Sequence, residues 1–342
     1  MKHHFKMNRF VVAAFVVVAL SATGLVAESR AHEKDKPKAA ADAAVFACPM
    51  HPEVTDTKPS NCPKCGMKLV AKTAPDSKGD SMASDHAMMK PHAPSSATIK
   101  VEISTKSPPA PGQPTPAVAK LVKLDGKPLT FADLDVAHTK RIHLLIVDES
   151  LSDYHHEHPT ETKTPGEFAF TFKPQHGGKY AVWADLVPTA TGNQEYAKTE
   201  VTVPGPPVPM QPAVNTTTMV NGYRFDLATE NNESFQASKA TLVKVSVTGP
   251  DGKPATNLEP VMGAFAHGVG FPADLSGVTH VHPMGHEPEQ ATERGGPELS
   301  FHLLPEKAGF MKFYVQVQLE GQDVYAGFGL DVEKANTGGA NH

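Results

Sequence analysis

Three cysteines and a histidine have a spacing that can hold a metal ion. Cys48 and His51 form one pair with two residues between them, and Cys62 and Cys65 form a second such pair, with ten residues between His51 and Cys62. Two-residue spacing lets both side chains of a pair point at one ion from a tight turn, so two pairs supply the four ligands of a tetrahedral site. The rest of the 342-residue chain contains no cysteine. This segment, residues 46–70, therefore predicts a small metal-bound unit, which we call the cysteine head.

Two other uses of these cysteines are open. A Cys62–Cys65 disulfide with Cys48 left free would suit an oxidising compartment. A thioredoxin-like redox motif needs a strand–helix–strand setting, which the four prolines of the segment disfavour. A segment this short buries too little apolar surface to fold alone, so a bound metal would be its core. Metal binding is the interpretation that the spacing favours.

The residues beside the cysteines bear on which metal is bound. A set of three cysteines and one histidine suits zinc, whereas the thioethers of Met50 and Met67 beside the thiolates favour soft monovalent copper or silver. We therefore predict monovalent copper or zinc at the head. The linker that follows carries further donors, which are either ordinary solvated side chains or an auxiliary copper or silver site: Met82, His86, Met88, Met89 and His92.

Two sets of histidines further along the chain offer a second kind of ligand. Each set has one lone histidine and, thirteen residues later, the first of two histidines separated by a single residue. Alternation along a strand puts both members of such a pair on one face, so three imidazoles converge if the earlier strand is a neighbour. Three imidazoles suit divalent copper or zinc. The candidate ligands are His143, His156 and His158 in the first set, and His267, His280 and His282 in the second.

These histidines also have a purely structural interpretation, in which they hydrogen-bond the scaffold or stand on an exposed face. If they do bind a metal, four nearby side chains are close enough in sequence to supplement them, namely His155, Glu157, Met284 and His286. Neither set includes a cysteine, which excludes a blue-copper electron-transfer centre.

The two histidine sets lie in two copies of one sequence. The motif DGKP occurs at 125–128 and at 251–254, and residues 143–159 align without a gap to residues 267–283. Short alternating or apolar runs separated by Gly, Pro, Asp and Asn fill both copies, which is typical of sandwich strands. We therefore predict an all-β fold. It consists of two tandem immunoglobulin-like β-sandwich domains preceded by a small metal-binding knuckle and a signal peptide.

Composition divides the rest of the chain. Basic residues precede the apolar run of residues 10–27, and small residues at 29 and 31 offer a cleavage site, as in a secretory signal peptide. An uncleaved membrane anchor is the alternative, since this run nearly suffices to span a bilayer. The predicted segments are a signal peptide at 1–31, a tether at 32–45, the cysteine head at 46–70, a linker at 71–97, the first sandwich at 98–203, a proline-rich linker at 204–216, the second sandwich at 217–334 and a tail at 335–342.

The charge of the chain limits its partners. The net charge is −5, and residues 1–31 hold four basic and one acidic side chain, so the part after the signal peptide has a net charge of −8. An acidic exported protein without a basic stripe is not expected to bind nucleic acid, nor a membrane once the signal is removed. A metal cation is the ligand that this charge suits.

The cysteine head resembles a known family. The stretches FACPMHPEV and KPSNCPKCGMKLV are similar to the heavy-metal-binding domain found at the ends of copper- and heavy-metal-exporting P-type ATPases and of periplasmic adaptor subunits of efflux pumps. The resemblance covers under a tenth of the chain, and Pro59-Ser60-Asn61 stands where the family commonly has Pro-Gly. It implies these ligands: Cys48, Cys62 and Cys65, with Met50, His51 and Met67 as further candidates. More loosely, the two copies resemble β-sandwich modules that accompany such domains in bacterial exported proteins.

Catalytic signatures are absent from the sequence, since no H-E-x-x-H, G-x-S-x-G, Walker or dinucleotide glycine motif occurs. We therefore expect a non-enzymatic periplasmic protein that binds, buffers or hands over copper or a similar soft metal. Its expected partner is a metal efflux or transfer protein. Two alternatives are open. One is an adhesion or scaffold protein with a structural zinc knuckle and protein-binding sandwiches, and the other is a copper enzyme built on the histidine sets.

Overall fold

The computed structural model of the protein describes residues 45–47, 55–58, 70–72 and 97–335. Most of the cysteine head and of the linker after it lies outside these residues, as does the predicted signal peptide. The candidate ligands that fall outside them are Cys48, Met50, His51, Cys62, Cys65 and Met67. In the part of the chain that the structure describes, no helix is long and apolar enough to cross a membrane.

Three short strands lie in the cysteine head and at its two ends. Strand β1 (Val45–Ala47) lies between β2 (Thr55–Asp56) and β3 (Val70–Lys72), and it pairs with both in the antiparallel sense. The two segments that contain the cysteines connect these strands.

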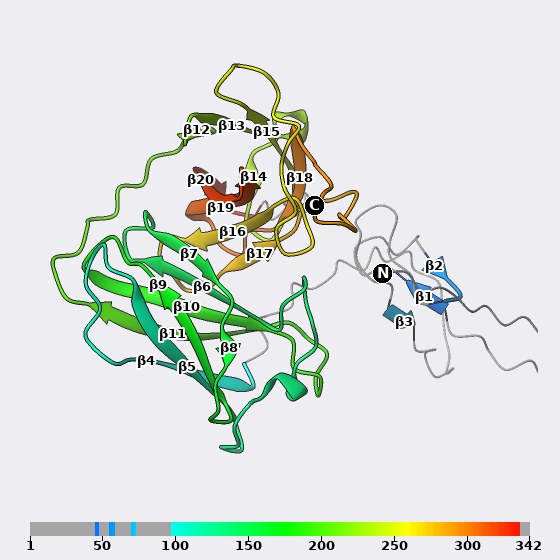
Figure 1. The fold of residues 1–342 in the computed structure, drawn as a ribbon. Coiled ribbons are helices and arrows are strands. Elements are labelled where there is room, and N and C mark those ends of the chain that lie inside the picture. The colour runs from blue at the N-terminus through cyan, green and yellow to red at the C-terminus, as the bar shows by residue number, and fades with distance from the viewer. Residues whose placement is uncertain (1–44, 48–54, 59–69, 73–96, 336–342) are drawn as a thin grey trace, which may run out of the picture. The chain divides into compact units, whose positions relative to one another are not determined.

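The first repeat is a sandwich of two four-stranded antiparallel sheets (Figure 1). One sheet has the order β4-β5-β9-β8, formed by β4 (Ile99–Thr105), β5 (Thr115–Lys123), β9 (Glu167–Phe172) and β8 (Thr160–Glu161). The other has the order β11-β10-β6-β7, formed by β11 (Glu195–Val203), β10 (Gly178–Leu186), β6 (Ile142–Asp148) and β7 (Tyr154–Glu157). A 3-10 turn, η1 (Phe131–Asp133), precedes β6.

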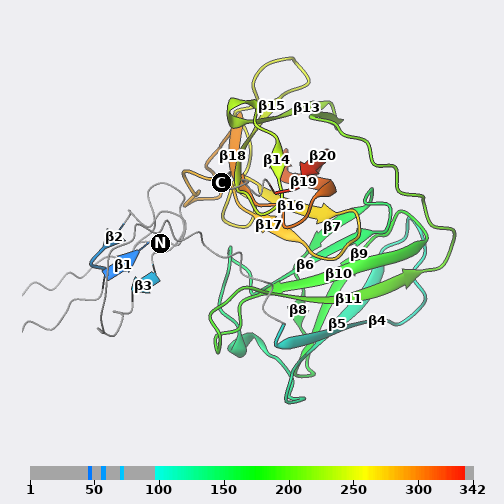
Figure 2. The ribbon, with the colours of Figure 1, turned by 180° about the vertical axis from the view of Figure 1, so that it is seen from behind.

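The second repeat follows the same plan, and Figure 2 shows its strands from behind. Its first sheet has the order β12-β13-β15-β18, formed by β12 (Thr217–Val220), β13 (Tyr223–Thr229), β15 (Thr241–Thr248) and β18 (Glu298–Leu303). Its second sheet has the order β14-β20-β19-β16-β17, formed by β14 (Phe235–Gln236), β20 (Gln322–Glu333), β19 (Gly309–Leu319), β16 (His267–Pro272) and β17 (Thr279–Val281). A 3-10 turn, η2 (Glu230–Asn232), precedes β14.

The prediction of two tandem β-sandwiches is confirmed, whereas their immunoglobulin-like topology stays a prediction. Alternating strands such as β5 and β9 bury one face, as their patterns predict. Strand β6 differs, because all seven of its residues are buried and its sequence IHLLIVD is almost continuously apolar. A strand buried throughout must be covered on both faces. One face of β6 packs into the core of its own sandwich through Ile142, Leu144 and Ile146.

The other face of β6 packs against the second repeat. Leu145 and Val147 belong to an apolar cluster that also holds Val269 and Phe271 of β16. The single tryptophan of the chain, Trp183 of β10, lies in this cluster with its ring centroid 5.5 Å from that of Phe271. The two repeats therefore share a third apolar core, which we call the inter-repeat core.

A hydrogen bond and a ring stack also connect the repeats. The Tyr314 hydroxyl donates to the Leu151 carbonyl oxygen at 2.8 Å, and the Tyr154 and Tyr314 rings stack with centroids 4.9 Å apart. These contacts join β7 and the turn before it to β19. The relative position of the sandwiches is thus set by packed aromatic side chains as well as by the linker between them.

Truncating Phe271 is expected to loosen the inter-repeat core. Phe271 is fully buried, so Phe271→Ala should reduce the free energy of unfolding by roughly 3–5 kcal/mol and change the native-state fluorescence of Trp183. Urea unfolding followed by tryptophan fluorescence measures both. Phe301→Ala is the control, because Phe301 is equally buried in the second sandwich's own core. It should lower stability while leaving the native Trp183 spectrum unchanged, and identical native spectra for both variants would contradict a shared core.

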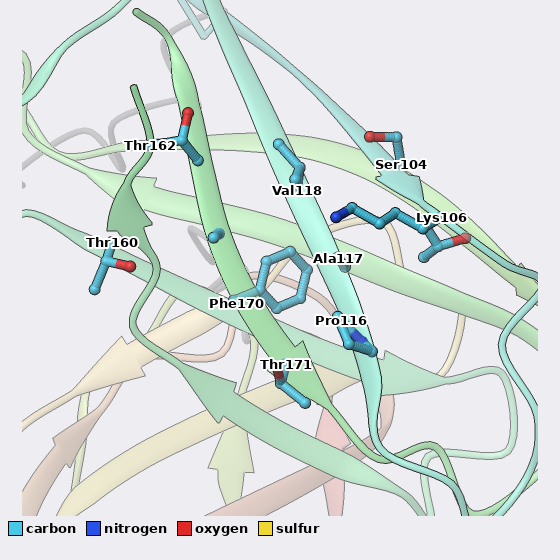
Figure 3. Close-up of a pocket in the computed structure, with 11 residues that line it drawn as sticks. Ser104, Lys106, Pro116, Ala117, Val118, Thr160, Thr162, Phe170 and Thr171 are labelled. Carbon is cyan, nitrogen blue, oxygen red and sulfur yellow. The ribbon is translucent and has the colours of Figure 1, made fainter. Parts of the chain in front are cut away.

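A pocket opens over the β4-β5-β9-β8 sheet of the first repeat (Figure 3). Its lining is mostly threonine and apolar side chains from β4, β5, β9 and β8, with Lys106 as the one charged residue among those that line it. This lining has no group of metal-ligating side chains, and the histidines lie elsewhere.

Candidate metal centre

The two histidine sets, expected as separate sites, form one cluster between the repeats. Across the repeats, ring centroids of His143 and His156 each lie 5.3 Å from that of His280, and those of His156 and His267 are 5.7 Å apart. One ligand atom from each of His143, His156 and His280 lies within 4.8 Å of the other two. The same holds for His267, His280 and His282. We call the six residues of the two sets the histidine centre.

Strand pairing brings each lone histidine beside its histidine pair. In the first repeat β6 pairs with β7 in the antiparallel sense, with Leu145 opposite His156. In the second repeat β16 pairs with β17 in the same way, with Val269 opposite His280. His143 and His267 lie at the start of β6 and β16, and His158 and His282 directly follow the ends of β7 and β17. Because the paired strands are antiparallel, the three histidines of each repeat meet at the same end of the strand pair.

An aspartate fixes the turn between the two strands of each pair. In the first repeat the Asp148 carboxylate accepts hydrogen bonds from the backbone N–H groups of Ser150, Ser152 and Asp153 at 3.2, 2.9 and 2.9 Å. In the second repeat Asp274 accepts from the Ser276 N–H at 3.0 Å. Short acceptors of this kind stabilise turns locally, so the sequence itself specifies the reversal that returns the chain to the centre.

In the first repeat, ring nitrogens of two histidines face the Nδ1 atom of His143. His143 Nε2–H donates to the Ala137 carbonyl oxygen at 3.1 Å, so its Nδ1 carries the lone pair in the neutral ring. That Nδ1 lies 3.0 Å from His156 Nε2 and 3.2 Å from His158 Nε2. His156 Nδ1–H in turn donates to Gln316 Oε1 at 2.8 Å, and the Gln316 amide also hydrogen-bonds the Asp323 carboxylate, which orients it.

In the second repeat, three ring nitrogens are buried without a hydrogen-bond partner. They are Nδ1 of His267, Nε2 of His280 and Nε2 of His282. The opposite nitrogens of two of these rings are engaged, since His267 Nε2–H donates to the Val261 carbonyl oxygen at 3.0 Å and His280 Nδ1–H donates to Asp185 Oδ2 at 2.6 Å. An unsatisfied buried polar atom costs about 1–3 kcal/mol, so three together require an explanation.

The Asp185 carboxylate is held in place by a further hydrogen-bond donor. The Gln194 side-chain amide donates to both of its oxygens, at 2.8 and 3.0 Å. Burial would raise the pKa of Asp185, but the hydrogen bonds and charge of His280, with help from Gln194, bring it below its usual range. The carboxylate is therefore ionised and fixes the ring of His280.

Five imidazoles of the centre, those of His143, His156, His158, His267 and His282, are neutral near pH 7. Burial lowers the pKa of His143 to about 4 and that of His158 to about 3, and neighbouring histidines act in the same direction. For the same two reasons the pKa values of His156, His267 and His282 lie well below their usual range. Neutral imidazole is the form that ligates a metal.

The donor set fits a borderline divalent metal. Every candidate ligand atom is an imidazole nitrogen, which suits zinc and copper, and a ring hydrogen-bonded to a carboxylate or carbonyl is the usual arrangement of a ligating histidine. The His143, His156, His267 and His280 side chains are nearly excluded from solvent, while His158 and His282 are half-buried. The last two form the side of the centre nearest to solvent.

Three residues of the site had not been predicted. His138 stacks on His282 with ring centroids 3.3 Å apart, while Asp185 and Gln316 support rings of the opposite repeat. The spacing of His138, five residues before His143, was a visible signal. Asp185 and Gln316 offered none, because their partners lie 95 and 160 residues away in the chain.

Two residues expected to supplement the sets lie elsewhere. His155 follows the strand alternation to the face opposite His156, where its ring packs near Phe172 and its Nε2 lies 3.0 Å from Asp153 Oδ1. His286 is exposed and its Nε2 lies 2.7 Å from Glu293 Oε2. The expectation that these two histidines add to the sites is therefore wrong.

Comparison with known proteins supports the metal-binding interpretation of the head. The model of the family described as heavy metal binding domain matches residues 45–72. No curated protein matches the chain. Among solved structures, Escherichia coli alpha-2-macroglobulin activated by porcine elastase matches with 15% identity and a TM-score of 0.21, over 69% of this chain and 20% of that one. This chain thus spans about a fifth of that protein's length.

A second family model matches both sandwiches. It covers residues 95–205 and again residues 217–334, which are the two repeats described above. The two matches together span more than half of the chain, so the duplication inferred from DGKP and the histidine pattern is a duplication of one family domain. The chain belongs to the family described as domain of unknown function DUF8832, of which it carries two copies behind a heavy-metal-binding domain.

Proposed function

We propose that the protein is an exported metal-binding protein that binds, buffers or hands over copper or a similar soft metal in the periplasm. The observation that carries the proposal is the match of residues 45–72 to the heavy metal binding domain, since a metal-binding role follows from it directly. The histidine centre adds a second place in the same chain where a metal fits.

The two places differ in chemistry. The head offers thiolates and thioethers, which favour monovalent copper, whereas the centre offers buried imidazoles, which favour zinc or divalent copper. Thiolates held by a short segment can exchange a metal with a partner, which suits a transfer role. Buried imidazoles supported by fixed acceptors suit retention of the ion. Export rests on the signal-like residues 1–31, and the absence of catalysis stays a prediction.

Replacing the head cysteines is expected to abolish tight binding of monovalent copper. The variant Cys48→Ser/Cys62→Ser/Cys65→Ser removes three soft ligands, so its affinity should fall by on the order of a hundredfold or more, beyond the 10–100-fold typical of losing a supporting residue. Competition with a chromogenic monovalent-copper chelator measures this affinity on the full chain.

The control is Met82→Leu/Met88→Leu/Met89→Leu, which alters the linker thioethers and leaves the cysteines intact. Its expected loss is small. Equal affinities of the cysteine variant and the unaltered chain would contradict the proposal. Zinc retained by the head without exchange would favour a structural knuckle in a scaffold protein instead.

A further inference from the structure

The histidine centre has two halves that match in detail. We propose that it is a pair of adjacent three-imidazole metal sites for zinc or divalent copper, one in each repeat, each completed by a hydrogen-bond acceptor from the other repeat. The site of the first repeat has His143, His156 and His158, and the site of the second has His267, His280 and His282. The inference deepens the proposed function and rests on the chain being a metal-binding protein.

The lone histidines of the two halves are held alike. His143 Nε2–H donates to the carbonyl of Ala137, six residues earlier, and His267 Nε2–H donates to that of Val261, also six residues earlier. Both bonds leave Nδ1 as the nitrogen that faces the centre. Duplication has therefore preserved the ring orientation as well as the residue.

The first histidines of the two pairs are held by exchanged partners. His156 of the first repeat donates to Gln316 of the second, and His280 of the second donates to Asp185 of the first. Asp185 lies opposite His143 on paired strands, and Gln316 lies opposite His267 in the same way, so the two acceptors occupy equivalent positions. The two halves of the centre are thus related by approximate two-fold symmetry, which exchanges the first repeat with the second.

Lone pairs converge in both halves. In the first repeat the Nδ1 of His143 and the Nε2 of His156 are 3.0 Å apart, although each ring already donates its N–H elsewhere. Two acceptors at this distance repel, and a cation bound to both lone pairs would remove that repulsion. Metal–nitrogen bonds of about 2.0–2.1 Å in tetrahedral geometry put ligand nitrogens roughly 3.3 Å apart, close to the spacings of 3.0 and 3.2 Å found here.

The second half presents the corresponding ring nitrogens, and there they have no hydrogen-bond partner. Its three buried unpartnered atoms belong to His267, His280 and His282, the three residues that correspond to the first set. Because one ligand atom of His280 also lies within 4.8 Å of those of His143 and His156, the two sites adjoin across the repeat boundary. Each metal would therefore link the two sandwiches through the exchanged acceptors.

The two sites are not equivalent, because their supporting acceptors differ in chemistry. His280 donates to the side-chain carboxyl group of Asp185 at 2.6 Å, whereas His156 donates to the side-chain amide of Gln316 at 2.8 Å. A carboxylate behind a ligating imidazole raises the basicity of the ring and strengthens the metal bond. The second-repeat site should therefore fill first, with an affinity on the order of 10–100-fold higher than the first-repeat site.

The test counts metal ions on the full chain with its three head cysteines changed to serine, so that the head does not contribute. Zinc titration with mass spectrometry should give two ions per chain. His158→Ala and His282→Ala form a matched pair, since both residues are half-buried and occupy equivalent positions. Each variant should bind one ion per chain. The more tightly bound ion should be lost only in His282→Ala. His286→Ala, at an exposed histidine bonded to Glu293, is the control and should leave two.

A second measurement tests adjacency. With divalent copper, two neighbouring ions couple magnetically, so the integrated electron paramagnetic resonance intensity should fall below that of two isolated coppers, and His158→Ala should restore a one-copper signal. The paired site would be overturned by either of two results. One is two magnetically uncoupled copper ions, and the other is a single ion per chain whose binding is unchanged in His158→Ala or in His282→Ala. If the variant with the three head cysteines changed to serine binds no metal while the unaltered chain binds copper, the inference fails and the proposed function stands. If the unaltered chain binds no metal, both fail.

Discussion

Acidifying the metal-free protein from pH 7 to pH 5 is expected to unfold the two repeats. Five buried or half-buried histidines of the centre have folded-state pKa values far below the usual value of about 6.5, among them His143 at about 4 and His158 at about 3. Between these values and pH 6.5 the unfolded chain binds more protons than the folded one. Stability therefore falls as the pH falls through this window.

The expected size of the effect is large. A pH of 5 is about 1.5 units below the pKa of histidine in the unfolded chain. Protonation of the unfolded chain therefore lowers the free energy of unfolding by about 2 kcal/mol per histidine. Five residues together give at most about 10 kcal/mol, comparable with the whole stability of a typical domain. Burial raises the pKa of Glu157 to about 7, so this residue stabilises the fold as the pH falls and offsets part of that loss. Asp185 does not offset this loss. Its lowered pKa contributes stability that is present above the unfolded value and disappears only at more acidic pH.

Urea unfolding in the presence of a chelator, followed by Trp183 fluorescence at pH 7 and pH 5, measures this loss. The zinc-loaded protein is the comparison, because bound metal holds the imidazoles neutral and should move the acid transition to lower pH. Equal free energies of unfolding at the two pH values would show that the imidazoles are not held neutral by burial.

His280→Ala is expected to destabilise the metal-free protein at pH 7 by roughly 3–5 kcal/mol, because it leaves the buried Asp185 carboxylate without its main partner. His156→Ala is the matched control. It occupies the equivalent position and opens a similar cavity, but the partner left behind is the neutral Gln316 amide, for which about 1–3 kcal/mol is expected.

Chemical denaturation of both variants in chelator separates the charge from the cavity. Adding Asp185→Asn to His280→Ala should recover part of the loss, because the buried group is then neutral and Gln194 can still hydrogen-bond it. Equal losses in His280→Ala and His156→Ala, with no recovery in the double variant, would show that the Asp185 charge does not stabilise the contact between the repeats.

Strand alternation and repetition made much of the fold predictable. The two copies of DGKP and the aligned histidines indicated the duplication, and the short alternating runs indicated sandwich strands, because the side-chain period of a strand is a local property of the sequence. The same reasoning put His156 and His158 on one face, and left open whether the strand of His143 was their neighbour. The structure supplies that pairing, since β6 and β7 are antiparallel neighbours.

The sequence by itself therefore determined the two sandwiches, the three histidines of each and the cysteine spacing of the head. Only the tertiary structure decided that both histidine sets face one centre, because docking of the repeats depends on the second buried face of β6 and on aromatic packing around Trp183. It also decided that Asp185 and Gln316 hydrogen-bond the rings of His280 and His156. Such contacts join residues about a hundred or more positions apart, and no periodicity along the chain records which of two distant faces will meet.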